Sequence, residues 1–141
     1  MAETKTTAAG GKMRCVVVTP EATLVDDTAD FVALPLFDGE IGIAPSHSPL
    51  IGRLGFGELR IESGDNERKL YVDGGFVEVV NNVISVLTNR AVDAKDLDLA
   101  AAEAQLQAAI KLPGNTDELQ AIRERSISQA RAQIHVALKA K

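Results

Sequence analysis

The sequence predicts a β domain followed by a pair of helices, and three observations support this prediction. Eight of the eleven glycines lie between Gly39 and Gly75, whereas alanine crowds residues 91–141. Short β-branched runs separated by turn residues fill residues 13–90, and apolar residues at helical spacing follow. Strands and helices that are segregated in this way are typical of a β-sheet domain with a helical appendage.

Residues 13–90 are expected to form a β-sandwich domain of seven or eight short strands. The clearest runs are Arg14–Thr19, Asp30–Leu34, Glu40–Ile43, Glu58–Glu62, Lys69–Asp73, Phe76–Val80 and Val83–Thr88. The run Glu58–Glu62 alternates polar and apolar residues, as a strand with one buried face does. Gly64-Asp65-Asn66 and Asn81-Asn82 predict turns. Strands spaced by about ten residues are typical of a sandwich or a flattened barrel.

Residues 91–141 are expected to form an antiparallel helical hairpin. Asp96 is placed to cap a first helix from about Leu97 to Leu112, and Asn115 or Thr116 caps a second helix. The predicted inner faces are Leu97, Ala100, Ala101, Ala104, Ala108 and Leu112, and then Leu119, Ile122, Ser126, Ala130, Ile134 and Ala137. Because alanine buries little area, we expect a weakly held hairpin that can open.

Composition and charge exclude several classes of protein. No apolar run approaches the length of a membrane-spanning helix. Residues 1–12 predict a flexible polar extension without the apolar middle of a secretion signal, so we expect the protein to stay where it is made. The net charge of −5 disfavours nucleic acid as a partner. The basic stretch from Arg123 to Lys141 indicates either an acidic protein partner or a solvated helix face.

No catalytic or metal-binding constellation stands out. His47 and His135 are far apart, without metal-ligand spacing, and the acidic pair Asp26-Asp27 lies in a predicted turn, as does Asp38 beside Glu40. Nucleotide-binding and nucleophile motifs are missing from the sequence. The single cysteine, Cys15, excludes an internal disulfide and is expected to be a buried, inert thiol. The residues therefore favour a non-enzymatic binding module without metal or cofactor.

The segment Gly39–Leu50, which reads G-E-I-G-I-A-P-S-H-S-P-L, resembles a signature of the epsilon subunit of F-type ATP synthase, called delta in mitochondria. The resemblance continues through Tyr71–Val79 to Asp96-Leu97-Asp98. It implies a ten-stranded β-sandwich followed by a two-helix hairpin. It also implies a non-catalytic central-stalk subunit that links gamma to the c-ring and turns with them as protons cross the membrane. Such a subunit is peripheral, at the cytoplasmic face of the inner (plasma) membrane, and associates with the membrane only through the complex.

The resemblance also implies contact residues. Glu40 would face the polar loops of the c-ring, and His47 would lie near the junction of gamma and the ring. The alternatives are a solvated turn carboxylate and a turn histidine that bonds nearby backbone. Arg123, Arg125 and Arg131 would meet acidic segments of the alpha/beta catalytic hexamer when the hairpin extends and inhibits ATP hydrolysis.

A regulatory nucleotide-sensing module is the alternative function, because some bacterial members bind ATP at the folded hairpin. Those members carry [IL]-D-x-x-R-A at the start of the first helix. The corresponding residues here are Leu97, Asp98, Leu99, Ala100, Ala101 and Ala102. Ala101 stands where the arginine should be, while Arg131 and His135 occupy the places of two arginines in the second helix. Because guanidinium groups bind phosphate through charge-assisted hydrogen bonds, we expect weak ATP binding.

Overall fold

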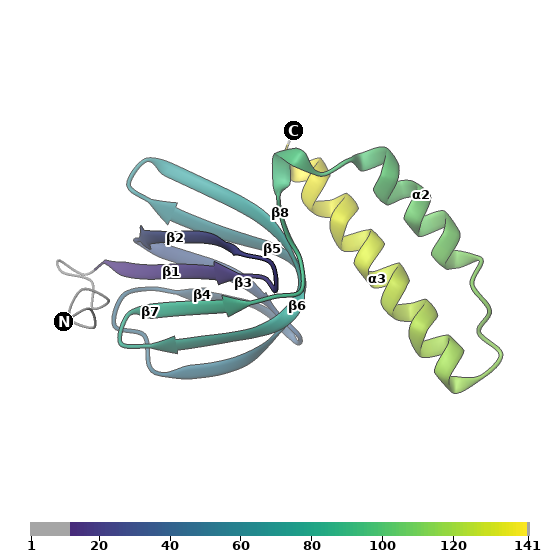
Figure 1. Ribbon diagram of the computed structural model, residues 1–141, viewed down its shortest axis with the longest axis horizontal. Coiled ribbons are helices and arrows are strands. Elements are labelled where there is room, and N and C mark those ends of the chain that lie inside the picture. Colours follow the sequence, from purple (N-terminus) through teal and green to yellow (C-terminus); the bar gives the residue numbers. More distant parts are fainter. Residues whose placement is uncertain (1–11, 141) are drawn as a thin grey trace.

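The computed structural model describes residues 12–140, in which a curled β-sheet carries a helical hairpin (Figure 1). The extension expected over residues 1–12 lies outside the described residues, apart from Lys12. The strands are β1 (Met13–Val18), β2 (Thr23–Ala29), β3 (Phe31–Leu36), β4 (Gly39–Ile43), β5 (Leu50–Ser63), β6 (Asn66–Val80), β7 (Val83–Leu87) and β8 (Ala91–Asp93). A short 3-10 helix, η2 (Ala94–Asp96), leads to the helices α2 (Leu99–Ile110) and α3 (Asp117–Lys139).

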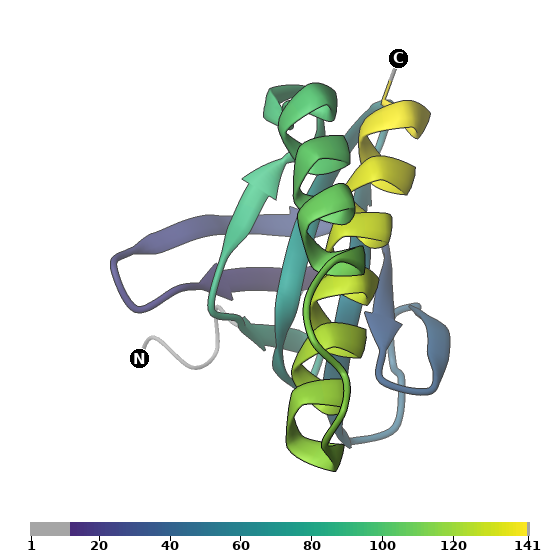
Figure 2. The same ribbon diagram turned by 90° about the vertical axis from the view of Figure 1, so that its right-hand side faces the viewer.

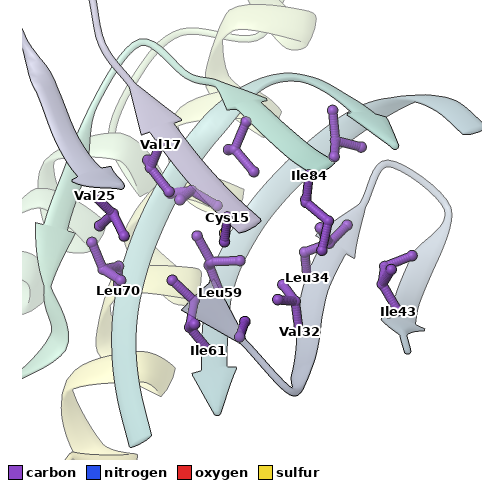
Figure 3. Close-up of a cluster of buried hydrophobic side chains, with 14 of the residues drawn as sticks. Cys15, Val17, Val25, Val32, Leu34, Ile43, Leu59, Ile61, Leu70 and Ile84 are labelled. Carbon is purple, nitrogen blue, oxygen red and sulfur yellow. The ribbon is translucent and has the colours of Figure 1, made fainter. Parts of the chain in front are cut away.

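The strands form a sheet in the order β2-β1-β7-β6-β5-β3-β4, with β8 paired to β6. All pairings are antiparallel except that of β1 with β7. The sheet curls over so that the inner faces of β1 to β7 share a core of aliphatic side chains (Figure 3). Cys15, Val32, Leu34, Leu59 and Ile84 are fully buried there. The expected β-sandwich and the expected burial of Cys15 are thus confirmed.

The expectation of ten strands was wrong, because β5 and β6 are long and continuous. Strand β5 has 14 residues and β6 has 15, and they pair with each other from end to end. The first half of β6 also pairs with β8, and its second half pairs with β7. Between these halves lie Gly74 and Gly75, whose φ angles are +72° and +113°. Glycine adopts such angles readily, so β6 bends there and continues, and the sheet of residues 12–140 has eight strands.

Strand β2 is a second difference, because Asp26 and Asp27 lie inside it and not in a turn. The guanidinium of Arg14 donates hydrogen bonds of 2.8 Å to both carboxylate oxygens of Asp26. Strand β2 ends the sheet order and is mostly exposed on one face, so charged side chains are tolerated there. Its polar sequence concealed it from a search for β-branched runs.

The hairpin covers one outer face of the sandwich. Helix α3 lies against β5 and β6, and α2 packs on the far side of α3 (Figures 1 and 2). Asp98, not the expected Asp96, caps α2, since its carboxylate accepts a hydrogen bond of 3.2 Å from the Ala101 amide. Asp96 instead ends η2. Thr116 caps α3 through the Leu119 amide, as expected.

The inner face of α2 differs from the expected one. Ala102 and Ala109 are buried, with Leu99 and Leu106 half-buried on the same face. The expected stripe of Ala100, Ala101, Ala104 and Ala108 is exposed. Both stripes have helical spacing, and the one that includes the two leucines removes more apolar area from water. In α3 the expected stripe is mostly inward, but its Ile122 is exposed.

Candidate protein-binding surfaces

The contact between the sandwich and α3 is small. Its apolar part consists of the buried Tyr71, Ala94 and Val136, with Phe56 and Leu97 packed against them. Tyr71 comes from β6 and Val136 from α3, so this cluster joins the two parts of the chain. We call it the docking cluster.

Polar groups surround the docking cluster. The Gln129 amide donates a hydrogen bond of 2.8 Å to Asp73, and the Tyr71 hydroxyl donates one of 3.3 Å to the same carboxylate oxygen. Burial raises the pKa of the Tyr71 hydroxyl, and the charge of Asp73 raises it further. Lys139 lies 3.5 Å from Oε1 of Glu58, whose side chain is only 7% exposed. Oε2 of Glu58 has no hydrogen-bond partner within residues 12–140.

The loop 44–49, which holds the candidate residue His47, is fixed to the turn between β6 and β7. The Ser46 amide donates a hydrogen bond of 2.6 Å to the side-chain oxygen of Asn82. His47 is half-buried, with Nδ1 2.7 Å from the carbonyl oxygen of Ser48. Because a carbonyl can only accept, Nδ1 carries the proton and Nε2 is left for another partner. The geometry thus fits a backbone-bonded turn histidine that keeps one nitrogen for an outside contact.

The structure does not bring Glu40 and His47 together. Glu40 is exposed at the start of β4, opposite Pro35, whereas loop 44–49 follows the other end of that strand. The hydrogen bond of Arg60 to Glu62 is the main cause that raises the pKa of Arg60, and the charge of Glu40 helps to raise it. Glu40 and His47 would therefore meet different parts of a partner.

The three candidate arginines of α3 have three different surroundings. Arg123 donates hydrogen bonds of 3.3 and 3.2 Å to the carbonyl oxygen of Ile110, at the end of α2. Arg125 lies over the ring of Phe56, 5.5 Å from its centre. Arg131 is exposed. They do not form one cluster while the hairpin is docked.

The residues at the positions of the ATP motif also differ in their surroundings. The Asp98 carboxylate is used as the cap of α2, Ala101 is exposed and Ala102 is buried. Arg131 and His135 are both exposed on α3. Residues 12–140 contain no group of three or more His, Cys, Asp and Glu side chains placed to hold a metal ion. Neither α2 nor α3 has the length and apolarity that a bilayer-spanning helix requires.

Sequence reasoning missed a row of large apolar side chains on the outside of the sandwich. They are Phe37, Ile51, Phe76 and Leu87, which are 69%, 77%, 58% and 53% exposed. Phe76 pairs with Leu87 on β7, and its partner on β5 is Arg53, two residues from Ile51, so these outward side chains lie near one another. The Phe37 amide bonds the Arg53 carbonyl oxygen. We call these four residues the apolar band; exposed apolar side chains gathered on one face are typical of protein-binding surfaces.

A signal for the band was present in the sequence. Val77 and Val79 point inward on β6, so Phe76 and Glu78 share its outer face. An aromatic residue at an outward position of an alternating strand departs from the usual polar pattern. The fold and this surface together define a β-sandwich domain that exposes large apolar side chains and is followed by a two-helix C-terminal region.

The chain belongs to the ATP synthase delta/epsilon chain family. The family described as "ATP synthase, Delta/Epsilon chain, beta-sandwich domain" matches residues 12–94. A protein of Rhodopirellula baltica named "ATP synthase epsilon chain" is 44% identical over 125 residues, which cover 89% of this chain and 98% of that protein. One of the same name from Leptospira interrogans is 39% identical over 102 residues, covering 72% of this chain and 80% of the relative.

Two solved structures are similar in fold. A chain of the Euglena gracilis mitochondrial ATP synthase OSCP/F1/c-ring structure has a TM-score of 0.77 at 18% identity, over 94% of this chain and 82% of that one. A chain of the Tetrahymena thermophila mitochondrial ATP synthase central stalk/c-ring structure has a TM-score of 0.66 at 15% identity, over 89% and 96% of the two chains. At such identities the likeness shows a shared fold.

Proposed function

We propose that this chain is a non-catalytic rotor subunit of a proton-translocating F-type ATP synthase, in which it links the gamma subunit to the c-ring. Family membership supports this role, and the two structures similar in fold are those of an OSCP/F1/c-ring assembly and of a central stalk/c-ring assembly. The apolar band carries the proposal, because large side chains left in water are what a permanent partner would cover. A rotor element transmits torque and needs rigid faces in place of reactive groups.

In this proposal the apolar band faces gamma. Loop 44–49, which holds His47, lies at the junction of gamma and the ring. Nε2 of His47 is the atom that a partner would contact. Glu40 faces the polar loops of the c-ring. The subunit is held at the cytoplasmic face of the membrane through the complex alone.

Pull-down of purified gamma by the full chain tests the proposal. Replacement of Ile51 or Phe37 by Ser should weaken binding by about 2 kcal/mol, or roughly thirtyfold, as expected for a central interface side chain. Leu24→Ser is the matched control, because Leu24 is also an exposed aliphatic residue but lies on β2, at the far edge of the sheet. Failure of the unaltered chain to bind gamma, or equal losses in the control, would contradict the proposal.

We further propose that the hairpin restrains ATP hydrolysis by extending toward the alpha/beta hexamer, where Arg123, Arg125 and Arg131 meet acidic segments. The small docking cluster supports a hairpin that can leave the sandwich, and the Arg123 bonds to Ile110 lie within the hairpin, so they survive that movement. Exposed ion pairs contribute about 0.2–1 kcal/mol each, so the three act together and weaken at high salt. Replacing all three by Gln should relieve inhibition of the assembled enzyme, and unchanged inhibition would count against the role.

Nucleotide sensing is the alternative, and we expect it to be weak in this chain. Each hydrogen bond to a charged group contributes roughly 1.5–3 kcal/mol, so the two missing arginines reduce ATP affinity by roughly a hundred- to ten-thousandfold. The Asp98 carboxylate is already engaged as a helix cap. Calorimetric titration with magnesium ATP checks this expectation, and a dissociation constant in the low micromolar range would contradict it.

A further inference from the structure

A groove of about 780 Å³ lies between the sandwich and α3, and the assignments above do not use it. Phe56, Phe76 and Leu87 supply much of its apolar wall. Arg53 enters it from β5 and Arg125 from α3. We call it the arginine groove.

The charged side chains that line the groove are all positive. Among the described residues that line it, the two arginines are the charged ones, and neither forms an ion pair within residues 12–140. This is unusual on a chain whose net charge is −5. A carboxylate is the complementary group, since a guanidinium binds it through two parallel hydrogen bonds.

Both guanidinium groups are held in place by aromatic rings. Arg53 lies 4.8 Å from the centre of the Phe37 ring, and Arg125 lies 5.5 Å from that of Phe56. Stacking on a ring face restrains the plane of a guanidinium and leaves its N–H groups available at the edge. Less side-chain freedom is then lost when an anion binds.

The groove joins two parts of the molecule. Arg53 belongs to the sandwich and Arg125 to the hairpin, so the complete groove exists only while α3 is docked. It is also continuous with the apolar band, because Phe76 and Leu87 belong to both. A partner that covers the band therefore reaches the groove directly.

We propose that the arginine groove receives a segment of the gamma subunit that carries a carboxylate among apolar side chains, and that this segment holds the hairpin in its docked position. The inference rests on the proposed function, which assigns the apolar band to gamma. Linkage requires the effect to be mutual: a segment that binds only the complete groove favours docking, and docking favours the segment.

Binding of purified gamma to the full chain, measured by calorimetry at low and high salt, tests the groove. Arg53→Gln and Arg125→Gln should each weaken binding roughly ten- to hundredfold at low salt, as expected for loss of a hydrogen bond between charged groups. The double variant should lose most of the salt dependence. Arg131→Gln is the matched control, because it removes the same charge from an exposed position of α3 outside the groove.

Hydrogen exchange of the α3 amides supplies a second measurement. Gamma should slow this exchange in the unaltered chain and should slow it less in Arg53→Gln, although that residue lies on the sandwich. If both groove variants bind gamma like Arg131→Gln at both salt concentrations, the groove inference is wrong while the proposed function stands. If the variants weaken binding of magnesium ATP and leave gamma binding unchanged, the groove is a small-anion site and the inference is overturned. If the unaltered chain does not bind gamma, both proposals fail.

Discussion

The sandwich core and the docking cluster are both buried, but they differ in size and in the residues that form them. The core combines aliphatic side chains from seven strands, whereas the docking cluster has Tyr71, Ala94 and Val136 inside a ring of polar groups. At about 25 cal/mol per Å² of apolar area, the core contributes far more to stability. The difference predicts that the hairpin can leave the sandwich while the sandwich itself stays folded.

The largest expected effect lies in the sandwich, at the bend of β6. In Gly75→Ala the new Cβ would collide with the backbone oxygen of Leu87, at a φ of +113° that side chains rarely adopt. We expect a loss of about 4 kcal/mol or more in the free energy of unfolding, which is at the extreme for a single substitution. Urea unfolding followed by circular dichroism measures it.

Gly74→Ala is the matched control for this bend. Its φ is +72°, but the nearest atom to a new Cβ is 3.5 Å away, on the flexible end of the Phe56 ring. We expect only the backbone strain, about 1–3 kcal/mol. Equal losses for the two variants would mean that the collision at Gly75 is relieved by movement of β7.

The second prediction compares one substitution in the two regions. Val77 in the core and Val136 in the docking cluster are both 1% exposed. Val77→Ala should lower the free energy of unfolding by about 2 kcal/mol, from two lost methyl groups and the cavity that they leave. Val136→Ala should leave unfolding of the sandwich nearly unchanged and instead speed hydrogen exchange in α3.

Cys15 provides the readout that separates these outcomes. It is the single cysteine, it is fully buried in the core, and burial raises the pKa of its thiol to about 12. A thiol reagent therefore labels it only when the sandwich opens. Labelling should accelerate in Val77→Ala and not in Val136→Ala. Equal acceleration in both would show that sandwich and hairpin unfold as one unit, against the comparison.

The fold was predictable where the local sequence alone determines the backbone conformation. The two turns at Gly64 and Asn81-Asn82 and the cap at Thr116 depend on local backbone preferences, and the structure has all three. The continuity of β5 and β6 was not predictable in this way, because glycine marks both a bend and a break. Strand β2 was missed because its place at the sheet edge, which tolerates charge, depends on tertiary structure.

The candidate surfaces were predictable only in part, for a similar reason. His47 could be singled out because the signature Gly39–Leu50 that contains it is a continuous stretch of sequence. The apolar band and the arginine groove combine residues from separate strands and from α3, and only strand register and the docking of α3 bring them together. The helix face of α2 was misjudged because both stripes have helical spacing and contain alanines, and the one with Leu99 and Leu106 is the one that packs inward.

A third prediction uses Tyr71, the single tyrosine in a chain without tryptophan, as a reporter of docking. Burial raises its pKa while the hairpin is docked, whereas in a detached hairpin the value returns toward about 10. The free energy of docking therefore keeps its full value below about pH 10. Above that pH it falls by about 1.4 kcal/mol per pH unit, because Tyr71 ionises only when the hairpin is detached. Absorbance titration of tyrosinate should show a raised midpoint that Val136→Ala lowers. An ordinary midpoint in the unaltered chain would mean that the docking cluster is already open.

The smallest expected effect is on the docking of the end of α3, where Lys139 forms an ion pair with Glu58. The pair is long at 3.5 Å and Lys139 is 47% exposed, so solvent screens most of the attraction. Glu58, however, is buried, its Oε2 has no hydrogen-bond partner within residues 12–140, and Lys139 is its one ion-pair partner there, so the variant removes that pair. Lys139→Met should thus weaken docking by about 1 kcal/mol or less, seen as faster exchange of the last α3 amides.

Lys111→Met is the control, because Lys111 is exposed at the end of α2, the helix on the far side of α3 from the sandwich. Adding Glu58→Gln to Lys139→Met should restore part of the loss, since the neutral amide no longer needs a counter-charge. That recovery distinguishes a charge effect from lost packing of the lysine stem, which Glu58→Gln would not repair. If Lys139→Met behaves like Lys111→Met, the docking cluster alone holds the hairpin, and its contrast with the sandwich core is sharper still.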